Sequence, residues 1–289
     1  MRSIKIFLMM IAAGLMLTAC EKHVIQYEAD PVKPGSAEFQ LHYFNPVVAG
    51  AANNIYRVEI NGEPYATASS PLNTYNAVPS GAVGLFYTAP AGMTNIKLYR
   101  SASLELVYDR NFELKPGKQN VFVHDFNKDP IVFDNLYPYP RNVSEYTDTM
   151  GWVRFFNFLY EEEGVPTPLK LQYQFQYVKD RATMERSEWL NVGQPVAFGE
   201  ATGWQPIPVI KEVVNTPSSG YARIDYRIRV IGTNGEDLGP LQVRNNANNS
   251  NMVDYSDWWN CYVGRHYMHI LAGMRVSTPL SSVRQFTSN

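Results

Sequence analysis

The sequence predicts an all-β protein in which two tandem antiparallel β-sandwich domains follow an N-terminal signal peptide and a flexible tether. Aromatic residues make up 13% of the 289 residues, with 19 Tyr and 14 Phe, and the chain also holds 19 Gly and 19 Pro. Aromatic residues suit half-buried pleated strands, while Gly and Pro mark the turns between them. Runs of alternating apolar and polar residues recur at spacings of roughly 8–12 residues, which is typical of a β-sandwich. A Pro-rich and polar stretch at 136–151 separates two such regions.

Residues 1–19 have the features of a signal peptide. Arg2 and Lys5 supply positive charge, and residues 6–17 form an apolar run. This run is shorter than the roughly 20 residues that span a bilayer. It fits the apolar region of a signal peptide, which has about 7–15 residues and is followed by small residues at the cleavage site. We therefore expect fold formation to begin after residue 19.

The cleavage region Leu17-Thr18-Ala19-Cys20 resembles the lipobox of bacterial lipoproteins. The resemblance implies cleavage before Cys20, a diacylglyceryl group on its sulfur and a further acyl chain, such as palmitate, on its new amino group. Two or three acyl chains, at about 0.8 kcal/mol per buried methylene, give permanent membrane attachment. The alternative is an ordinary secretory signal with an incidental cysteine. Glu21-Lys22-His23 follows and lacks the Asp that retains lipoproteins in the inner membrane, which favours the outer membrane and display on the cell exterior.

Charge and cysteine content exclude several classes of protein. The formal net charge is −2 for the full chain, and about −4 once the two positive charges of the signal peptide are removed. A nucleic-acid-binding protein needs a basic stripe, so we expect no nucleic-acid partner. If Cys20 carries lipid, Cys261 is alone and no intramolecular disulfide forms. A free cysteine in an apolar stretch behaves as a small buried hydrophobe, which is the role we expect for Cys261.

Residues 20–35 carry the lipidated cysteine and a tether without periodicity, and residues 36–136 form the predicted N-terminal sandwich. Phe39, Leu41 and Tyr43 alternate with polar residues and should share one face of a strand. Asn61-Gly62 predicts a tight hairpin, because both residues accept a positive φ. The strands expected in this domain cover 39–43, 55–60, 84–88, 95–100, 104–112, 120–126 and 131–135, with turns at 90–92 and 115–117.

Residues 137–150 form the predicted linker, and residues 151–289 the C-terminal sandwich. Within it, Arg223, Asp225, Arg227 and Arg229 alternate with apolar residues and should occupy the polar face of one strand. Asn234-Gly235 predicts another hairpin. The segment 180–190 has good helix formers and is expected to be a short surface helix or a loop. The strands expected in this domain cover 152–158, 169–178, 204–210, 222–231, 262–271 and 274–277.

The two predicted domains open and close on similar motifs. Leu41-His42-Tyr43-Phe44-Asn45 opens the first domain, and Val153-Arg154-Phe155-Phe156-Asn157 opens the second. Near the ends, Gly117–Val123 matches Gly264–Ile270, which places Val121 opposite Met268 in the alignment. The motifs agree in order and in strand position. They predict two related domains, with larger loops in the second.

Motifs of the first domain resemble a family called domain of unknown function 4397, which is common in surface lipoproteins of the Bacteroidota. The matching segments are Tyr43-Phe44-Asn45-Pro46, Val58-Glu59-Ile60-Asn61-Gly62, Ala89-Pro90-Ala91-Gly92 and Lys115-Pro116-Gly117-Lys118. The resemblance covers residues 36–135. It implies an immunoglobulin-like sandwich, and hence two tandem immunoglobulin-like domains, without known enzymatic activity. In the linker, Asp148-Thr149-Met150 resembles the O-glycosylation sequon of exported Bacteroidota proteins, which makes Thr149 a candidate glycosylation site.

Catalytic and metal-binding patterns are absent from the sequence. There is no Gly-x-Ser-x-Gly motif, no phosphate-binding Gly-rich loop and no paired-Cys motif, so no catalytic residue, metal or cofactor is expected. His266 and His269 would face opposite sides of a strand and could not chelate one metal ion. His23, His42 and His124 have no ligand spacing either.

Aromatic residues are the best candidates for a binding site, because aromatic anchors dominate interfaces. The candidates are Tyr255, Trp258 and Trp259, which follow the polar segment 244–251, together with the secondary candidates Trp204, Trp189, Tyr137 and Tyr139. Adjacent strand residues point to opposite faces, so one tryptophan of the pair can fill the core while the other packs under the Asn-rich loop or faces a ligand.

These features support three non-enzymatic hypotheses. The leading one is an outer-membrane lipoprotein that acts by binding, as an accessory subunit of a SusC/SusD-like nutrient-uptake complex; the transporter link is an analogy. The second is an adhesin or fimbria-like structural subunit, and the third is a surface glycan-binding protein. The expected partners are the membrane, through the lipid on Cys20, then outer-membrane transporter subunits, and a glycan or peptide.

Overall fold

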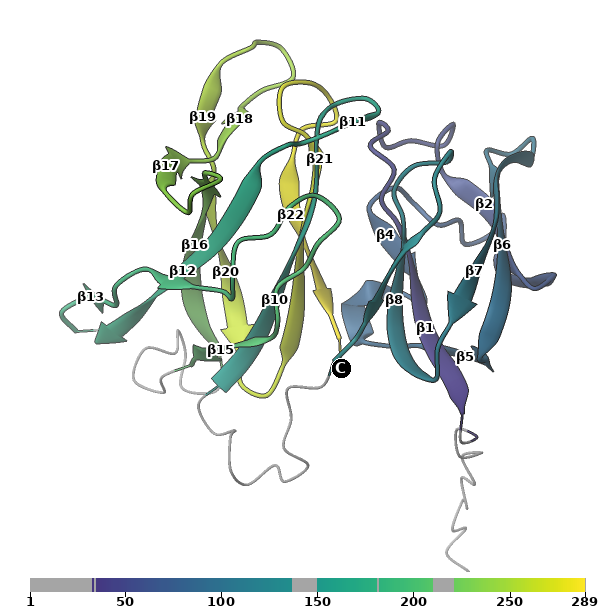
Figure 1. Cartoon of the computed structure of the whole chain (residues 1–289), viewed down its shortest axis with the longest axis horizontal. Helices are drawn as coiled ribbons and strands as arrows, with labels where there is room; N and C mark the ends of the chain where they lie inside the picture. Colours follow the sequence, from purple (N-terminus) through teal and green to yellow (C-terminus); the bar gives the residue numbers. More distant parts are fainter. Residues whose placement is uncertain (1–32, 34, 137–149, 181, 210–220, 289) are drawn as a thin grey trace, which may run out of the picture. The chain divides into compact units, whose positions relative to one another are not determined.

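The computed structural model describes residues 33, 35–136, 150–180, 182–209 and 221–288 (Figure 1). The chain divides into two units, residues 1–33 and 34–289, and every described strand belongs to the second. Cys20, His23 and Thr149 lie outside the described residues, so the predictions made for them stay predictions. No helix among the described residues is long and apolar enough to cross a membrane.

The strands before residue 137 form two facing sheets, here called the first sheet pair (Figure 1). One sheet contains β4 (Asn76–Val78), β1 (Ser36–Tyr43), β8 (Gly117–Val123) and β9 (Ile131–Asp134), with β5 (Tyr87–Pro90) also paired to β1. The other contains β3 (Glu63–Ala66), β2 (Ile55–Ile60), β6 (Gly92–Arg100) and β7 (Glu105–Leu114). A 3-10 turn spans Gly81–Val83, between β4 and β5. A core that includes Phe39, Leu41 and Tyr43 fills the space between the sheets, as the alternation in β1 predicts.

The strands after residue 149 form the second sheet pair. One sheet contains β11 (Val165–Pro166), β10 (Met150–Glu162), β21 (His266–Met274) and β22 (Ser282–Thr287), with β15 (Gln205–Pro208) paired to β10. The other contains β13 (Glu185–Arg186), β12 (Lys170–Asp180), β16 (Tyr221–Ile231) and β17 (Asp237–Pro240), with β14 (Leu190–Asn191) paired to β12 and β20 (Ser256–Tyr262) paired to β16. A separate hairpin contains β18 (Gln242–Arg244) and β19 (Met252–Asp254). The all-β, β-sandwich-like prediction is therefore confirmed for the described residues.

Most predicted turns and strands agree with the structure, and the exceptions have local causes. Asn61 (φ 52°) and Gly62 (φ 85°) form the turn between β2 and β3. The segment 182–190 contains turns and short strands but no helix. The single strand predicted over 262–271 is two strands, β20 and β21, because Gly264 adopts a φ of 74° and reverses the chain. The strand predicted over 274–277 is wrong, because β21 ends at Met274 and a turn follows.

The predicted internal repeat has a structural counterpart in two parallel strand pairs. β1 pairs in parallel with β8, and β10 pairs in parallel with β21. Leu41 lies opposite Val121, whereas Val153 lies opposite Tyr267. The predicted match of Val121 with Met268 is therefore wrong by one residue. A shift of one residue moves a side chain to the other face of its sheet.

A third cluster of buried side chains, here called the joint, connects the two sheet pairs. It forms on the faces of the β1–β8 and β10–β21 sheets that point away from their own cores. The rings of Phe122 and Phe158 stack with centroids 4.6 Å apart, and His124 Nδ1 lies 2.8 Å from the Tyr160 hydroxyl. The buried members of the joint are Phe44, Tyr75, Ala77, Phe122, Phe156, Phe158, Met268, Ile270, Ala272 and Phe286. Because of these contacts, residues 34–289 form one compact unit.

We expect Phe122→Ala to lower the free energy of unfolding by about 3–5 kcal/mol, because truncation of a buried Phe leaves a cavity. Urea denaturation of the full mature chain measures this loss. The exposed Met93→Ala variant is the control, since Met93 is 74% exposed, and it should change stability by less than about 0.5 kcal/mol. A loss of less than about 1 kcal/mol for Phe122→Ala would show that the joint contributes little to stability.

Candidate functional site

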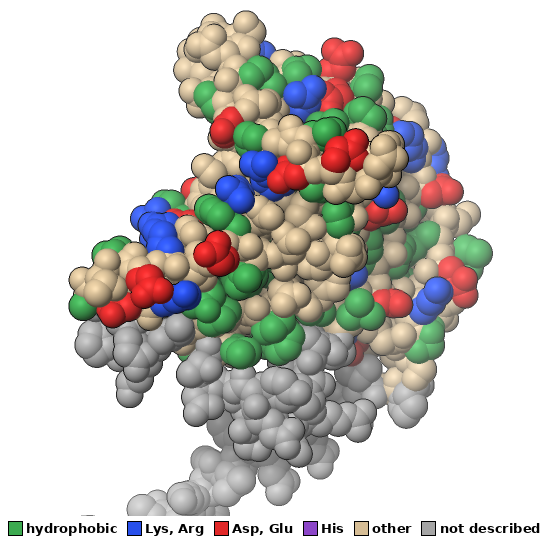
Figure 2. Space-filling view, turned by 60° about the vertical axis from the view of Figure 1, so that its left-hand side comes forward, with side chains coloured by type: hydrophobic (Ala, Val, Ile, Leu, Met, Phe, Trp, Pro, Cys, Tyr) green, Lys and Arg blue, Asp and Glu red, His purple; other side chains and the backbone are tan. Residues whose placement is uncertain are grey.

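The outward side of the β12–β16–β20 sheet carries the most distinctive group of exposed side chains. Residues that alternate with the core residues of these strands must point away from the core. We call this surface the polar sheet face, and it consists of Gln174, Gln176, Arg223, Asp225, Arg227, Arg229, Trp258 and Asn260. Figure 2 brings the side of the molecule with β13 and β17 forward and shows charged side chains of both signs interspersed with polar and hydrophobic ones.

Strand register arranges the polar sheet face into rows across the sheet. Asp225 lies opposite Gln176 on one neighbouring strand and opposite Trp258 on the other. One row further along β16, Arg227 lies opposite Gln174. Each aromatic ring or guanidinium group on the face therefore has an amide or carboxylate beside it.

Two tryptophans lie over opposite edges of this sheet. Trp258 on β20 is 49% exposed, and the Arg223 guanidinium carbon lies 4.6 Å from its ring centroid. Trp189, between β13 and β14, is half-buried, and the Arg227 guanidinium carbon lies 4.3 Å from its ring centroid. Cation–π contact at such distances holds both rings in fixed positions. Since β12 and β16 separate β14 from β20, the two edge strands are about 14 Å apart at roughly 4.8 Å per strand.

The arginines of the face differ in their partners. Arg223 Nε lies 2.9 Å from Asp225 Oδ1, and Arg186 forms a second ion pair with the same carboxylate. Arg229 Nη2 lies 2.9 Å from Asp237 Oδ2. Arg227 instead donates from Nε to the amide oxygen of Gln174 at 2.8 Å, and it has no carboxylate partner among the described residues.

The structure separates the aromatic residues that the sequence groups together. Trp258 faces solvent, whereas Trp259 is 6% exposed and packs its ring against Tyr267 and His269 in the core. Trp259 therefore fills the core and has no free face for a ligand. This assignment follows from the pairing of Trp258 with Asp225 on the polar side of β16.

The other two aromatic candidates have structural contacts. The Tyr255 hydroxyl accepts a hydrogen bond from the Val283 backbone N–H at 2.7 Å. The Trp204 indole N–H is 2.8 Å from the carbonyl oxygens of both Asn135 and Leu136, so Trp204 helps connect the two sheet pairs. The structure brings neither residue to the polar sheet face. Trp189, a secondary candidate from the sequence, does join the face, through the path of the segment between β13 and β14, which alternation does not predict. Tyr137 and Tyr139 lie outside the described residues.

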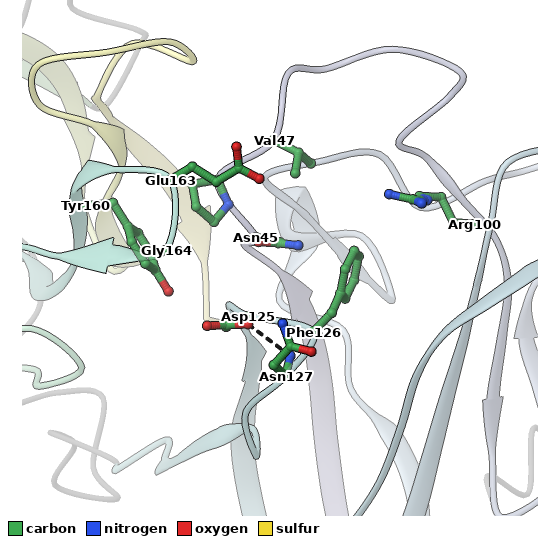
Figure 3. Close-up of a pocket in the computed structure, with 10 residues that line it drawn as sticks. Asn45, Val47, Arg100, Asp125, Phe126, Asn127, Tyr160, Glu163 and Gly164 are labelled. Atoms are coloured by element: carbon green, nitrogen blue, oxygen red, sulfur yellow. Dashed lines mark hydrogen bonds between the residues drawn. The ribbon is translucent and has the colours of Figure 1, made fainter.

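A cavity of about 220 Å³ lies beside the joint (Figure 3). Its lining includes Asn45 and Asp125 from the first sheet pair and Tyr160 and Glu163 from the second. The Asp125 carboxylate accepts a hydrogen bond from the Asn127 backbone N–H at 2.9 Å, drawn as a dashed line in Figure 3. No side chain in this lining is paired as a nucleophile with a base, and we assign no chemistry to the cavity.

The histidines and Cys261 are structural where the structure describes them. His266 stacks on Trp152, and His269 contacts Tyr173 and Trp259, so the two rings lie on opposite faces of β21 as predicted. Burial raises the pKa of the Cys261 thiol, which keeps it protonated. Within the described ranges, no group of three or more His, Cys, Asp or Glu side chains is placed to hold a metal ion.

Comparisons with known proteins give no family. No protein-family model matches the chain, and no curated protein matches it. Among solved structures, the Bacillus anthracis TIE protein is similar at 9% sequence identity with a TM-score of 0.24. The match covers 84% of this chain and 34% of that one, so the chain spans about a third of its length. A similarity at this TM-score carries no argument about fold or function.

Stability should fall as the pH falls from about 6.5 toward 4, because three buried histidines resist protonation. Burial lowers the pKa of His42 and of His269 to about 3, and that of His124 to about 4. The unfolded chain binds protons below about pH 6.5 that the folded chain excludes. Each histidine therefore removes up to about 1.4 kcal/mol of stability per pH unit in this window.

Urea midpoints measured at about pH 7, 6 and 5 test this dependence. Paired carboxylates do not account for it. Partial burial opposes ionisation of Glu161, but hydrogen bonds from Arg275 and Thr167 outweigh it and lower the pKa of Glu161, so its contribution is lost only in more acidic solution. Replacement His124→Gln should make the decline less steep. Equal midpoints at pH 7 and pH 5 would contradict the prediction.

Proposed function

We propose that this protein is a non-enzymatic surface lipoprotein that binds a glycan through the polar sheet face. The observation that carries the proposal is Trp258, a half-exposed indole held by Arg223 in a row with amide and carboxylate side chains. A sugar ring presents C–H groups on its faces and hydroxyl groups at its rim. The C–H groups pack on an aromatic ring, while the hydroxyls bond to surrounding amide and guanidinium groups.

The form of the site supports a polymer rather than a single sugar. The polar sheet face is built on strands, and its two indoles pack on two different arginines of β16, Trp258 on Arg223 and Trp189 on Arg227. An extended chain of sugars can contact both rings at once, and each contact adds to the affinity. We further infer that each sheet pair is an immunoglobulin-like sandwich, because each has two facing sheets around its own core.

We propose an outer-membrane location with display on the cell exterior, where the lipid on Cys20 holds the binding face near its ligand. The features that support it are the apolar segment 6–17 and the motif that ends at Cys20. A glycan-binding lipoprotein at that surface suits an accessory subunit of a SusC/SusD-like nutrient-uptake complex, which is an analogy of role. The adhesin alternative needs a strand that leaves its sheet. β22 gives it no support, since β22 pairs with β21 over six residue pairs and buries Phe286.

Trp258→Ala should weaken glycan binding at least about tenfold, or about 1.4 kcal/mol, because truncation of an aromatic anchor removes the stacking surface. Affinity electrophoresis in gels that contain a panel of polysaccharides measures the change. Phe86→Ala is the matched control, since Phe86 is a half-buried ring with the Lys118 ammonium 5.0 Å from its centroid in the first sheet pair. Unretarded migration of the unaltered protein in every gel would reject glycan binding.

Cys20→Ser should move the protein from the outer-membrane fraction to the soluble fraction, because serine has no thiol to accept lipid. Fractionation of cells that express either form measures the shift. Detergent extracts of the same cells also test the uptake proposal, in which the unaltered protein is recovered together with an outer-membrane transporter subunit. Recovery of the protein alone would count against the transporter partnership, and retention of Cys20→Ser in the membrane would count against the lipid anchor.

A further inference from the structure

We propose that the glycan bound by the polar sheet face is anionic, with carboxylate groups of a polyuronate received by Arg227. This inference rests on the proposed function and specifies the chemical class of its ligand. The first argument is the charge of the face. Four arginines contact or belong to it, namely Arg186, Arg223, Arg227 and Arg229, against two aspartates, Asp225 and Asp237. The chain as a whole has a net charge of −2, so this excess of positive charge is local.

The second argument is the environment of Arg227. Its Nε–H donates a hydrogen bond to the Gln174 amide oxygen, and one face of its guanidinium group packs on the Trp189 ring. These two contacts fix the direction of the guanidinium group. Its terminal Nη groups have no hydrogen-bond partner among the described residues. A planar guanidinium group held in this way presents two parallel donors, which match the two oxygens of a carboxylate.

The electrostatic surroundings agree with this geometry. Partial burial and the neighbouring Arg229 lower the pKa of Arg227, and the more distant Asp237 opposes this shift only in part. A carboxylate placed there relieves the repulsion between the two guanidinium groups.

Stacked arginines of the first sheet pair provide a contrast. Arg57 lies over the ring of Tyr99 and forms an ion pair with Glu59, and Arg110 lies over the ring of Tyr108 with Asp129 3.8 Å away. Both have a carboxylate from the chain itself. Arg227 also stacks on an aromatic ring, but it has no carboxylate partner among the described residues. The position that a carboxylate would occupy beside its guanidinium group is therefore available to a ligand.

The aromatic rings select a saccharide over other anions. Trp258 and Trp189 offer two apolar surfaces beside the charged groups. A phosphate ion or an acidic peptide would use the arginines and leave the half-exposed indole of Trp258 without an apolar partner. A polyuronate uses both, because each sugar unit carries a C–H face and a carboxylate.

Polygalacturonate and its methyl-esterified form are matched probes, since esterification removes the negative charge and keeps the sugar backbone. The unaltered protein should bind the acid form more tightly than the ester. The preference should shrink when NaCl is raised from about 0.05 M to about 0.5 M, because salt screens exposed charges. Isothermal titration calorimetry on the full mature chain measures both affinities.

Arg227→Gln should lower the ratio of acid to ester affinity about tenfold, because a charge-assisted bidentate contact is lost. Trp258→Ala should weaken binding of the acid form and binding of the ester form by similar factors. Arg57→Gln is the control and should leave the ratio unchanged. Arg227→Lys keeps the charge without the planar pair of donors and should give an intermediate ratio, which separates charge from geometry.

Two kinds of failure are distinguishable. Equal binding of acid and ester by the unaltered protein, or an unchanged ratio in a folded Arg227→Gln variant, would overturn the anionic ligand while glycan binding stands. Absence of binding to both probes and to neutral polysaccharides would overturn the proposed function itself. Binding of an acidic protein with the same dependence on Arg227, and of no polysaccharide, would assign the face to a protein partner.

Discussion

The two-sided burial of β1, β8, β10 and β21 is the constraint on which the rest of the structure depends. β8, β10 and β21 each have side chains in the core of their own sheet pair and others in the joint, and His42 of β1 stacks on Phe122 of the joint. Aromatic rings provide most of the joint, and they combine a large buried area with directional edge and face contacts. With these sheets covered on both sides, the outward side of the β12–β16–β20 sheet is left to carry polar groups and exposed rings.

Several buried polar groups beside the joint have hydrogen-bond partners, whereas the Tyr75 hydroxyl and His42 Nδ1 have none among the described residues. The Arg154 side chain is buried, has no carboxylate partner within the described ranges, and donates to the carbonyl oxygens of Asp134 and Thr202. Asn120 connects His42 on one side to Asn135 on the other. An unsatisfied group in such a position costs about 1–3 kcal/mol. Of these bonds, the one from Arg154 to Asp134 joins the two sheet pairs.

Alternation in the sequence predicts the strands well where one face is apolar and the other polar. It fails where a polar residue is buried by distant partners. His42, Asn120 and Arg154 read as solvent-facing residues in their strands, yet all three are buried in the joint. A strand pattern contains only the contrast between its own two faces. It does not contain the contact of His42 with Phe286 or the hydrogen bond from Arg154 to the Asp134 carbonyl oxygen, which join the two halves of the chain. The sequence therefore does not predict the joint. It predicts β8, β10 and most of β21, but not β4 and β22, which contribute Ala77 and Phe286 to the joint.

The candidate site, too, is predicted only in part by the alternation of residues along its strands. The alternation of Arg223, Asp225, Arg227 and Arg229 predicts a polar face, and β16 has one. Which of Trp258 and Trp259 faces solvent depends on the register of β20 against β16. The sequence does not show this register, because residues 256–258 of β20 are all exposed and no alternation marks the start of that strand. Trp189 lies in the segment that joins β13 and β14, both of which pair with β12, and the path of this segment brings its ring to Arg227.

The position of Phe286 has a consequence for the order of folding. This residue belongs to β22, close to the last described residue, yet its ring contacts Phe44 and His42 near the beginning of the first sheet pair. Gly81 is suited to this contact, since a Cβ atom there would collide with the Phe286 ring. The predicted signal peptide implies export with the N-terminus first, so the first sheet pair crosses the membrane before residue 286. Its half of the joint then stays open, as a row of aromatic rings in water, until β10, β21 and β22 follow, and this interval is when the protein most needs protection from aggregation.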